Sequence, residues 1–381
     1  MSIKDKYAFA GLGFTKMGRL PELTGHELAV QAALLAIEDA GLKKSDINGY
    51  ICQQAPGAGR LMDVVRDIGI NAKLIWQLEG SGTHGIGVFL SALGALETGI
   101  CDTVILVYAT STSRPMGGPP MGGQSMEGAY GLFGAAAVVA GWTRRYMHLY
   151  GITEQHLGAV ATTLRDYANK RPEAVMHDKK LTMEDYLNSR YIAEPLRARD
   201  CCLVNDGAAA LIITTAEKAR SLRRPPIYIM GYSQDFSMGK ADQSIEAVHG
   251  FDGEMTRKSG EKALKMAGIE LKDLDVAQFY DAFTINIIDQ LSGYGWCKRG
   301  EEGAFIEEGN IRLGGAIPCN TSGTELSWGY LHVWTHFIEA IRQLRGEAGE
   351  CQVKNVETCL VTGGLSAVDV GLAAACFILR R

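Results

Sequence analysis

The pattern of apolar and polar residues along the chain predicts strands that alternate with amphipathic helices. The segment Tyr7–Gly13 is a short apolar run ending in glycine, and it predicts a first strand. Residues 24–40 then repeat apolar side chains at helical spacing. Thr24 and Glu27 stand three residues apart, as in a capping box, and Gly41 follows the last apolar residue. A helix is therefore predicted between these two signals.

The same order of elements occurs twice. Residues 36–47 align without a gap on residues 263–274, and each stretch holds a helix end, a glycine stop, a polar turn and the entry to a strand. In the first copy that strand is Ile47–Cys52. Cys101–Val107 and Val356–Val361 form a second matching pair of apolar strands. Chance similarity of short units could give such echoes, but their separation favours a duplicated α/β domain over a solenoid.

A long insertion, roughly residues 111–202, interrupts the first copy. It opens with the Gly/Pro/Met-rich stretch Pro115–Gly123, which is typical either of an apolar lid or of a surface excursion. Two amphipathic helices are predicted after it, at Thr153–Lys170 and Met183–Tyr191.

The two halves meet near residue 224. The strand Ala208–Thr214 closes the first half, and Arg223-Arg224-Pro225-Pro226 marks a boundary before the apolar run Ile227–Met230. We therefore predict domains at residues 1–224 and 225–381.

Composition and charge disfavour several classes of protein. The 381 residues are 46% hydrophobic, enough for a large core, and the net charge of −5 without a basic run disfavours nucleic acid as a partner. Nine cysteines without CxxC or Cys/His ligand spacing disfavour a disulfide framework and a structural zinc site. No apolar stretch is long enough to span a membrane, and the first residues lack a signal-peptide core. We expect a soluble cytoplasmic protein.

The stretch Asn320–His332 is the first candidate for chemistry. It is rich in Asn, Ser, Thr and Gly, and it precedes the apolar-periodic segment Val333–Leu344, which predicts a helix. A loop before a helix N-terminus offers backbone N–H groups and a positive dipole end, which suit an oxyanion or a phosphate. An ordinary capped helix start has the same pattern.

Three motifs give the chain a family resemblance. Together with the duplicated plan, Cys202–Ala210, Tyr280–Thr284 and Asn320–Gly323 resemble the thiolase superfamily, in its sterol-carrier-protein-type branch, over essentially the whole length. The resemblance implies a five-layered α/β/α/β/α fold, a dimer, and an active site between the halves that acts on acyl-CoA thioesters. It also implies that Leu74–Leu78 or Asp102–Tyr108 pairs across the dimer axis.

The thiolase nucleophile is missing. In thiolases a cysteine opens a helix in a CxxG motif, whereas here Gly82 stands at that position and Gly85 matches the motif's glycine. The second catalytic cysteine, in a C-terminal Cys-x-Gly, is absent from Thr362–Ser366. Ser81 could replace the nucleophile only with a base within reach, and His84 is the candidate base.

Tyrosines stand at two other family positions. Tyr330 occupies the place of the histidine in Gly-His-Pro, and Tyr280 replaces the other oxyanion-hole residue. In both respects, and in the His332 that follows, the chain is similar to the lipid-transfer-type aldolases of steroid side-chain degradation. Those enzymes act with a small OB-fold/zinc-ribbon protein that binds the CoA part, so we expect such a partner, a CoA thioester substrate and no covalently bound cofactor.

The residues favour proton transfer over acyl transfer. Claisen cleavage needs a thiolate relay, whereas retro-aldol cleavage needs a base for the β-hydroxyl and donors for the enolate, roles open to tyrosine. We expect Tyr280, Tyr330 and His332 to be catalytic. The plainer alternatives are a buried structural role for each tyrosine and a helix-start position for His332. Trp328 and Trp334 would make the acyl pocket apolar, or would be ordinary core residues. Support for the loop or oxyanion is expected from these residues: Asp281, Asn320, Ser322, Gly323, Gly82 and His84.

Three hypotheses remain open. The first is an acyl-CoA aldolase that cleaves a β-hydroxyacyl-CoA with a tyrosine acid–base pair. The second is a 3-oxoacyl-CoA thiolase with an unconventional active site. The third is a non-catalytic thiolase-like subunit of an acyl-CoA complex. The identity of the acyl group does not follow from the sequence.

Overall fold

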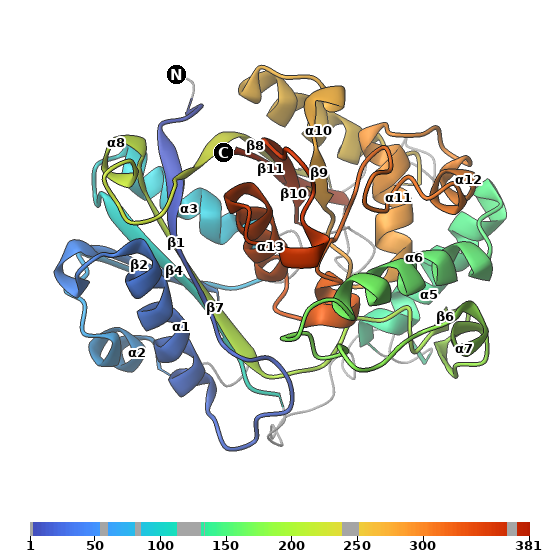
Figure 1. Ribbon diagram of the computed structural model, residues 1–381, viewed down its shortest axis with the longest axis horizontal. Helices are drawn as coiled ribbons and strands as arrows, with labels where there is room; N and C mark the ends of the chain where they lie inside the picture. The colour runs from blue at the N-terminus through green and yellow to red at the C-terminus, as the bar shows by residue number, and fades with distance from the viewer. Residues whose placement is uncertain are drawn as a thin grey trace.

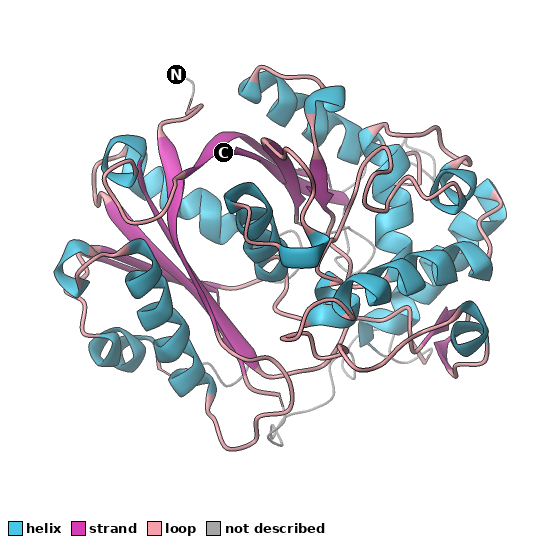
Figure 2. Cartoon of the chain, viewed as in Figure 1, coloured by secondary structure: helices cyan, strands magenta, loops and turns pink. Residues whose placement is uncertain are grey.

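A computed structural model describes residues 3–53, 60–80, 85–112, 131–132, 134–237, 251–363 and 372–381. Strands and helices alternate along most of this chain (Figures 1 and 2). The strands are β1 (Tyr7–Phe14), β2 (Gly49–Gln53), β3 (Leu74–Leu78), β4 (Thr103–Thr110), β5 (Tyr191–Ala193), β6 (Leu196–Arg197), β7 (Gly207–Thr215), β8 (Ile227–Ser237), β9 (Val276–Gln278), β10 (Thr358–Thr362) and β11 (Leu372–Arg380). The helices are α1 (Gly25–Ala40), α2 (Leu61–Ile68), α3 (Ile86–Glu97), α5 (Gly134–Tyr150), α6 (Glu154–Ala168), α7 (Met183–Leu187), α8 (Ala216–Ala219), α10 (Glu254–Ala267), α11 (Thr284–Tyr294), α12 (Glu302–Glu307) and α13 (Trp334–Arg345).

The sheet repeats one topology. Its nine strands run in the order β3-β2-β4-β7-β1-β8-β11-β10-β9. In the first half β2 pairs parallel with β4, β4 pairs antiparallel with β7, and β7 pairs antiparallel with β1. In the second half β9 pairs parallel with β10, β10 pairs antiparallel with β11, and β11 pairs antiparallel with β8. The predicted duplication is thus visible strand by strand, while the exact boundary at residue 224 stays a prediction.

The sequence repeat is reproduced in atomic detail. Gly41 and Gly268 end α1 and α10 in the left-handed conformation, at φ 70° and 68°. Two residues later, the N–H of Lys43 and that of Glu270 each donate to an aspartate three residues on, both at 2.8 Å. A Cβ built at Gly11 or at Gly231 would lie 2.4 Å from a carbonyl oxygen of α1 or α10, so both strands need glycine where the helix packs.

Five layers follow from the alternation of side chains along the strands. In β7, Leu211 and Ile213 point into one core cluster and Ile212 into another beneath α1. In β11, Phe377 points into that same first cluster, while Ile378 faces the core under α10 and α11. The shared cluster surrounds α3 and α13, so the layers run α1/α2, first-half strands, α3/α13, second-half strands, α10/α11, in agreement with the predicted thiolase fold.

The α3–α13 layer places the candidate site. The rings of Phe89 in α3 and Phe337 in α13 stack with centroids 4.0 Å apart. Trp334, at the first position of α13, packs against Phe89 at 5.0 Å. In Figure 1 these two helices lie between the two groups of strands. The N-termini of two equivalent helices are thereby brought together at the interface of the halves.

The insertion differs in part from its prediction. Helix α6 confirms the predicted helix at residues 153–170, but α7 ends at Leu187, and Tyr191–Ala193 forms the strand β5 instead of the end of a helix. Helix α5, at Gly134–Tyr150, was not predicted. The predicted lid at residues 115–123 lies outside the described residues.

Candidate active site

The loop Asn320–His332 lies in the interior of the protein. Residues 320–329 are buried, and Thr324–Trp328 form a π-helical turn. Asn320, Thr324 and His332 have positive φ values of 52°, 29° and 52°, a region that non-glycine residues rarely occupy. Strained backbone that packing holds in place is common at functional sites.

The backbone of this loop is mostly used internally. Tyr330 donates its N–H to Asn205 and Leu331 donates to Thr335, while Ser327 and Gly329 donate to loop carbonyls. The expectation of a row of free N–H groups is therefore wrong for most of the loop. A buried loop must satisfy its own backbone polar groups, and that need takes the donors away from a ligand.

Asn320 shapes the approach to Tyr280. Its side chain accepts from the N–H of Phe279 at 2.9 Å and donates to the carbonyl of Phe279 at 2.7 Å. The next residue, Tyr280, donates its N–H to Thr362 Oγ1 at 2.9 Å and accepts at its carbonyl from Gln290 at 2.9 Å. The backbone of Tyr280 is therefore held from β10 and α11, and Asn320 holds the residue before it.

Asn205 holds Tyr330 in the same manner. Its Oδ1 accepts the N–H of Tyr330 at 2.7 Å, and its Nδ2 donates to the carbonyl of Tyr330 at 3.3 Å. Asn205 is 3% exposed and belongs to the segment between the insertion and β7. The first half thus fixes the loop tyrosine of the second half. Asn205 lies within the motif Cys202–Ala210, but no pattern along the sequence indicates its role.

Tyr330 and His332 form a direct pair. The hydroxyl of Tyr330 lies 2.7 Å from Nδ1 of His332, and the ring of Tyr108 meets the ring of His332 edge-on at 5.3 Å. Burial lowers the pKa of His332 to about 4, so its imidazole is neutral at pH 7. A neutral imidazole with a free ring nitrogen can accept the hydroxyl proton of Tyr330.

The two tyrosines share one environment. Burial raises the pKa of Tyr330 well above its usual value, and the largest electrostatic contribution after burial comes from Tyr280, followed by Cys202. The phenol of Tyr330 therefore carries its proton at neutral pH. The structure brings Tyr280, Tyr330 and His332 together, as the sequence predicted, while their catalytic roles remain a prediction.

The remaining support residues have structural contacts. Asp281 accepts from Thr324 Oγ1 at 2.5 Å and from the N–H of Glu325 at 3.2 Å, so it holds the loop. Ser322 accepts the N–H of Thr324 at 3.3 Å. A Cβ on Gly323 would lie 2.5 Å from a carbonyl oxygen of α6, so this position requires glycine. These three residues shape the loop.

The residues directly before α3, in the first half, lie next to those directly before α13. A Cβ built at Gly85 would lie 3.2 Å from Val333, directly before α13. Gln53, at the end of β2, donates to the carbonyl of Gly80 at 2.8 Å and accepts from Trp334 Nε1 at 2.7 Å. Gly82, His84 and Ser81 themselves lie outside the described residues. Trp328 and Trp334 are fully buried core residues.

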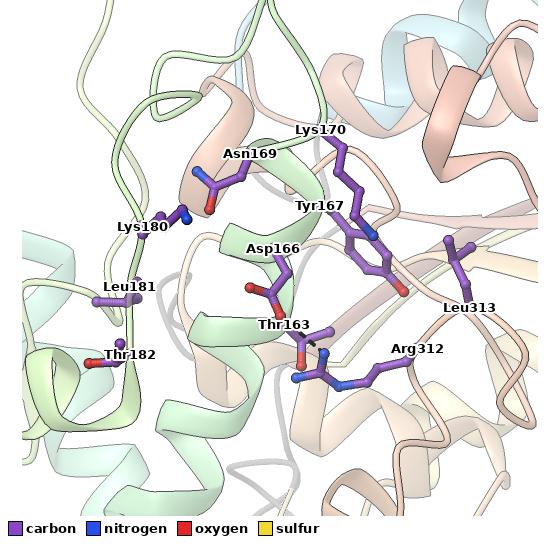
Figure 3. A pocket seen from close by; sticks show the side chains of 10 residues that line it. All are labelled: Thr163, Asp166, Tyr167, Asn169, Lys170, Lys180, Leu181, Thr182, Arg312 and Leu313. Carbon is purple, nitrogen blue, oxygen red and sulfur yellow. Dashed lines mark hydrogen bonds and ion pairs between the residues drawn. The ribbon is translucent and has the colours of Figure 1, made fainter.

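A surface depression lies on α6, outside the tyrosine site. It has a volume of about 650 Å³, and Figure 3 shows Asp166 and Arg312 joined across it by an ion pair of 3.0 Å. Lys170 and Lys180 line it too, but none of Tyr280, Tyr330 and His332 does. The depression is therefore separate from the candidate chemistry.

Comparison with known proteins agrees with this geometry. The Thiolase C-terminal domain-like family matches residues 239–374. A steroid side-chain-cleaving aldolase of Thermomonospora curvata is 34% identical over 96% of both chains. The 17-hydroxy-3-oxo-4-pregnene-20-carboxyl-CoA lyase of Mycobacterium tuberculosis is 33% identical over 97% of this chain and 99% of that protein.

Solved structures give the same result. An Ltp2-ChsH2(DUF35) aldolase is 32% identical and superposes with a TM-score of 0.86 over 99% of this chain and 98% of that chain. The acetyl-CoA acetyltransferase of Syntrophomonas wolfei, 17% identical, shares the fold with a TM-score of 0.74 over 99% of this chain and all of its own.

The fold and the full-length relatives define a thiolase-type enzyme of carbon–carbon bond chemistry. The chain belongs to the thiolase superfamily, and within it to the aldolases, which are carbon–carbon lyases. Among the described residues, none of the helices is both long and apolar enough to cross a membrane.

Proposed function

We propose that this enzyme cleaves a β-hydroxyacyl-CoA by a retro-aldol reaction, with Tyr330 and Tyr280 as its acid–base pair. The 2.7 Å contact between the Tyr330 hydroxyl and a neutral His332 carries the proposal. It gives Tyr330 a partner for its own proton, which leaves an oxygen lone pair available to the substrate.

The reaction balances without an added reagent. Tyr330 takes the proton of the β-hydroxyl while its own proton moves toward His332. The oxygen electrons of the substrate form the new carbonyl, the bond between the α and β carbons breaks, and its electron pair becomes the thioester enolate. Tyr280 donates to that enolate and delivers a proton to the α carbon. One proton leaves the substrate oxygen and one reaches carbon, so no free CoA is consumed, and transfer of the proton from His332 back to Tyr280 restores the starting state.

The thiol beside the tyrosines supports this reaction over acyl transfer. Cys202 donates its N–H to the carbonyl of Ala282, two residues after Tyr280, at 2.8 Å, so it lies close to the site. Burial, and then the carboxyl of Glu325, raise the pKa of Cys202 well above its usual value. A thiol that keeps its proton is a poor nucleophile. The sequence holds no cysteine between Cys52 and Cys101, where a thiolase carries its nucleophile.

We also propose a substrate class and two partners. The relatives' names support a CoA ester on a steroid side chain as the substrate. The assembly named for the related structure supports a second protein, which we expect to be the OB-fold/zinc-ribbon type that binds the CoA part. For a homodimer, β3 is the remaining candidate because it lies at the sheet edge, whereas β4 is already paired on both sides.

The test is the removal of one oxygen atom. Tyr330→Phe should lower kcat by at least ~10²-fold in a panel of β-hydroxyacyl-CoAs, because loss of a proton-transfer group typically costs 10²–10⁴-fold. Substrate binding should persist. Tyr191→Phe is the matched control, since its hydroxyl bonds Glu154 at 2.9 Å in the insertion. Wild-type turnover in the Tyr330→Phe enzyme would refute the assigned role.

A further inference from the structure

A buried cluster of three ionisable side chains lies beneath the tyrosines. Asp281, Glu325 and His336 are all fully buried, and a ligand-type atom from each lies within 4.8 Å of the other two. Nε2 of His336 lies 2.8 Å from Oδ1 of Asp281, and Nδ1 of His336 lies 3.9 Å from Oε1 of Glu325. None of the three takes part in the proposed proton transfers.

Asp281 already has its full set of donors. Oδ1 faces the His336 ring nitrogen and the N–H of Glu325, and Oδ2 accepts from Thr324. An acceptor with three donors is the expected state of an ionised carboxylate. Because a carboxylate oxygen accepts, the proton of this contact lies on Nε2 of His336, directed toward Asp281.

Glu325 has no such donors. Neither of its carboxyl oxygens, nor Nδ1 of His336, has a hydrogen-bond partner within the part of the chain that the structure describes. An ionised carboxylate without donors is strongly disfavoured in a protein interior, and the charge of Asp281 disfavours it further. Burial and Asp281 accordingly raise the pKa of Glu325 well above its usual value.

We propose that Glu325 is held as a neutral carboxylic acid, so that this cluster carries a single negative charge, on Asp281, beneath the tyrosine pair. The backbone N–H of Glu325 donates to Asp281 at 3.2 Å, and its neutral side chain adds no second charge to the site.

The charge of this cluster reaches the reacting groups. The His336 ring lies 5.8 Å from the ring of Tyr280. Tyr108 on β4, Cys202 before β7 and Tyr330 on the loop also face Glu325, whose ionisation would raise the pKa of each. An ionised Glu325 would therefore oppose negative charge on Tyr330 or on a nearby enolate. This consequence rests on the proposed tyrosine chemistry, whereas the protonation state itself does not.

The test is the pH dependence of thermal stability for the full chain and for Glu325→Gln, which keeps the shape and stays neutral. A carboxyl whose pKa is higher in the folded state than in the unfolded one loses stability as pH rises above the unfolded value of about 4.5. Glutamine has no such loss. The Tm of the variant minus that of the wild type should therefore rise by a few degrees between about pH 5 and pH 8.

A matched control has the opposite expectation. Glu302 is also fully buried, but its oxygens accept from Tyr146 and from the N–H of Gly300, each at 2.7 Å. Glu302→Gln should lower the Tm throughout this pH range. A flat or falling Tm difference for Glu325→Gln would overturn the proposal, since it would mean that Glu325 is ionised and paired with protonated His336 or with a cation.

Two further readouts do not require a well-folded variant. The infrared spectrum of the wild-type protein with carbon-13-labelled glutamate should contain the carbonyl stretch of a protonated carboxyl at neutral pH, and its absence would overturn the proposal. Elemental analysis of the chain purified alone should find no stoichiometric metal, and a bound divalent ion would overturn it too. Neither readout uses turnover, so failure here is distinguishable from failure of the tyrosine mechanism.

Discussion

Asn205 offers the sharpest test of how the two halves build one site. Its side chain makes two hydrogen bonds to the backbone of Tyr330, at 2.7 and 3.3 Å, and it is 3% exposed. Asn205→Ala removes both bonds and leaves a buried N–H and carbonyl without these partners. Each lost bond is worth about 0.5–1.5 kcal/mol, and an orphaned buried group about 1–3 kcal/mol, so we expect a loss of about 2–4 kcal/mol in the free energy of unfolding.

Turnover should fall by more than stability alone explains. Displacement of a reacting group by about 1 Å can cost ~10²-fold in rate, so Asn205→Ala should lower kcat by about that factor under conditions where the variant is fully folded. Asn205→Asp keeps the acceptor for the Tyr330 N–H but places an oxygen against the Tyr330 carbonyl, so it should fall between the alanine variant and the wild type.

Asn48 supplies the matched control. Its side chain donates to Oδ2 of Asp102 at 3.0 Å and accepts the N–H of Asp102 at 3.1 Å, so it links the segments that precede β2 and β4. This contact lies at the opposite end of β2 from Gln53. Asn48→Ala should lose stability in urea titrations and keep wild-type kcat. If Asn205→Ala is destabilised to the same degree and also keeps wild-type kcat, then Asn205 does not position Tyr330.

Three further predictions concern stability and assembly. Arg171→Met should lower the free energy of unfolding by about 3–5 kcal/mol, because it leaves the fully buried Glu339 without the guanidinium 2.7 Å away; urea titration checks this, and an unchanged midpoint would contradict it. Gly268→Ala should cost about 1 kcal/mol at its φ of 68°, and Tm measurements showing no loss would count against the left-handed helix end. Trp76→Glu, on the exposed edge strand β3, should reduce the mass measured by sedimentation to that of a monomer, and an unchanged dimer would exclude that edge.

Local signals predicted most of the fold. The helix that ends at Gly41 and its counterpart that ends at Gly268 depend on residues within a few positions of each other, so both could be found in the sequence. The helix predicted through Tyr191 failed, because β5 pairs with β6 and no local pattern signals that pairing. The fold class came from the repeat together with the family resemblance.

The sequence predicts only some of the residues of the candidate site. Tyr280 and Tyr330 were found because they replace residues at known family positions. Asn205 was missed because its partner is 125 positions away, and the orphaned oxygens of Glu325 become apparent only when its neighbours are known. Hydrogen-bond partners and burial are properties of the folded chain, so no spacing along the sequence reports them.

The reaction class is the central claim, and the requirement for free CoA tests it most directly. The enzyme, with its partner protein where turnover requires one, is incubated with a β-hydroxyacyl-CoA in the absence of free CoA, and products are followed by mass spectrometry. The account predicts equal amounts of a shorter acyl-CoA and a ketone or aldehyde, with no adduct on the intact protein. Cleavage of a 3-oxoacyl-CoA that occurs only with added CoA, accompanied by a trapped acyl-enzyme, would contradict it.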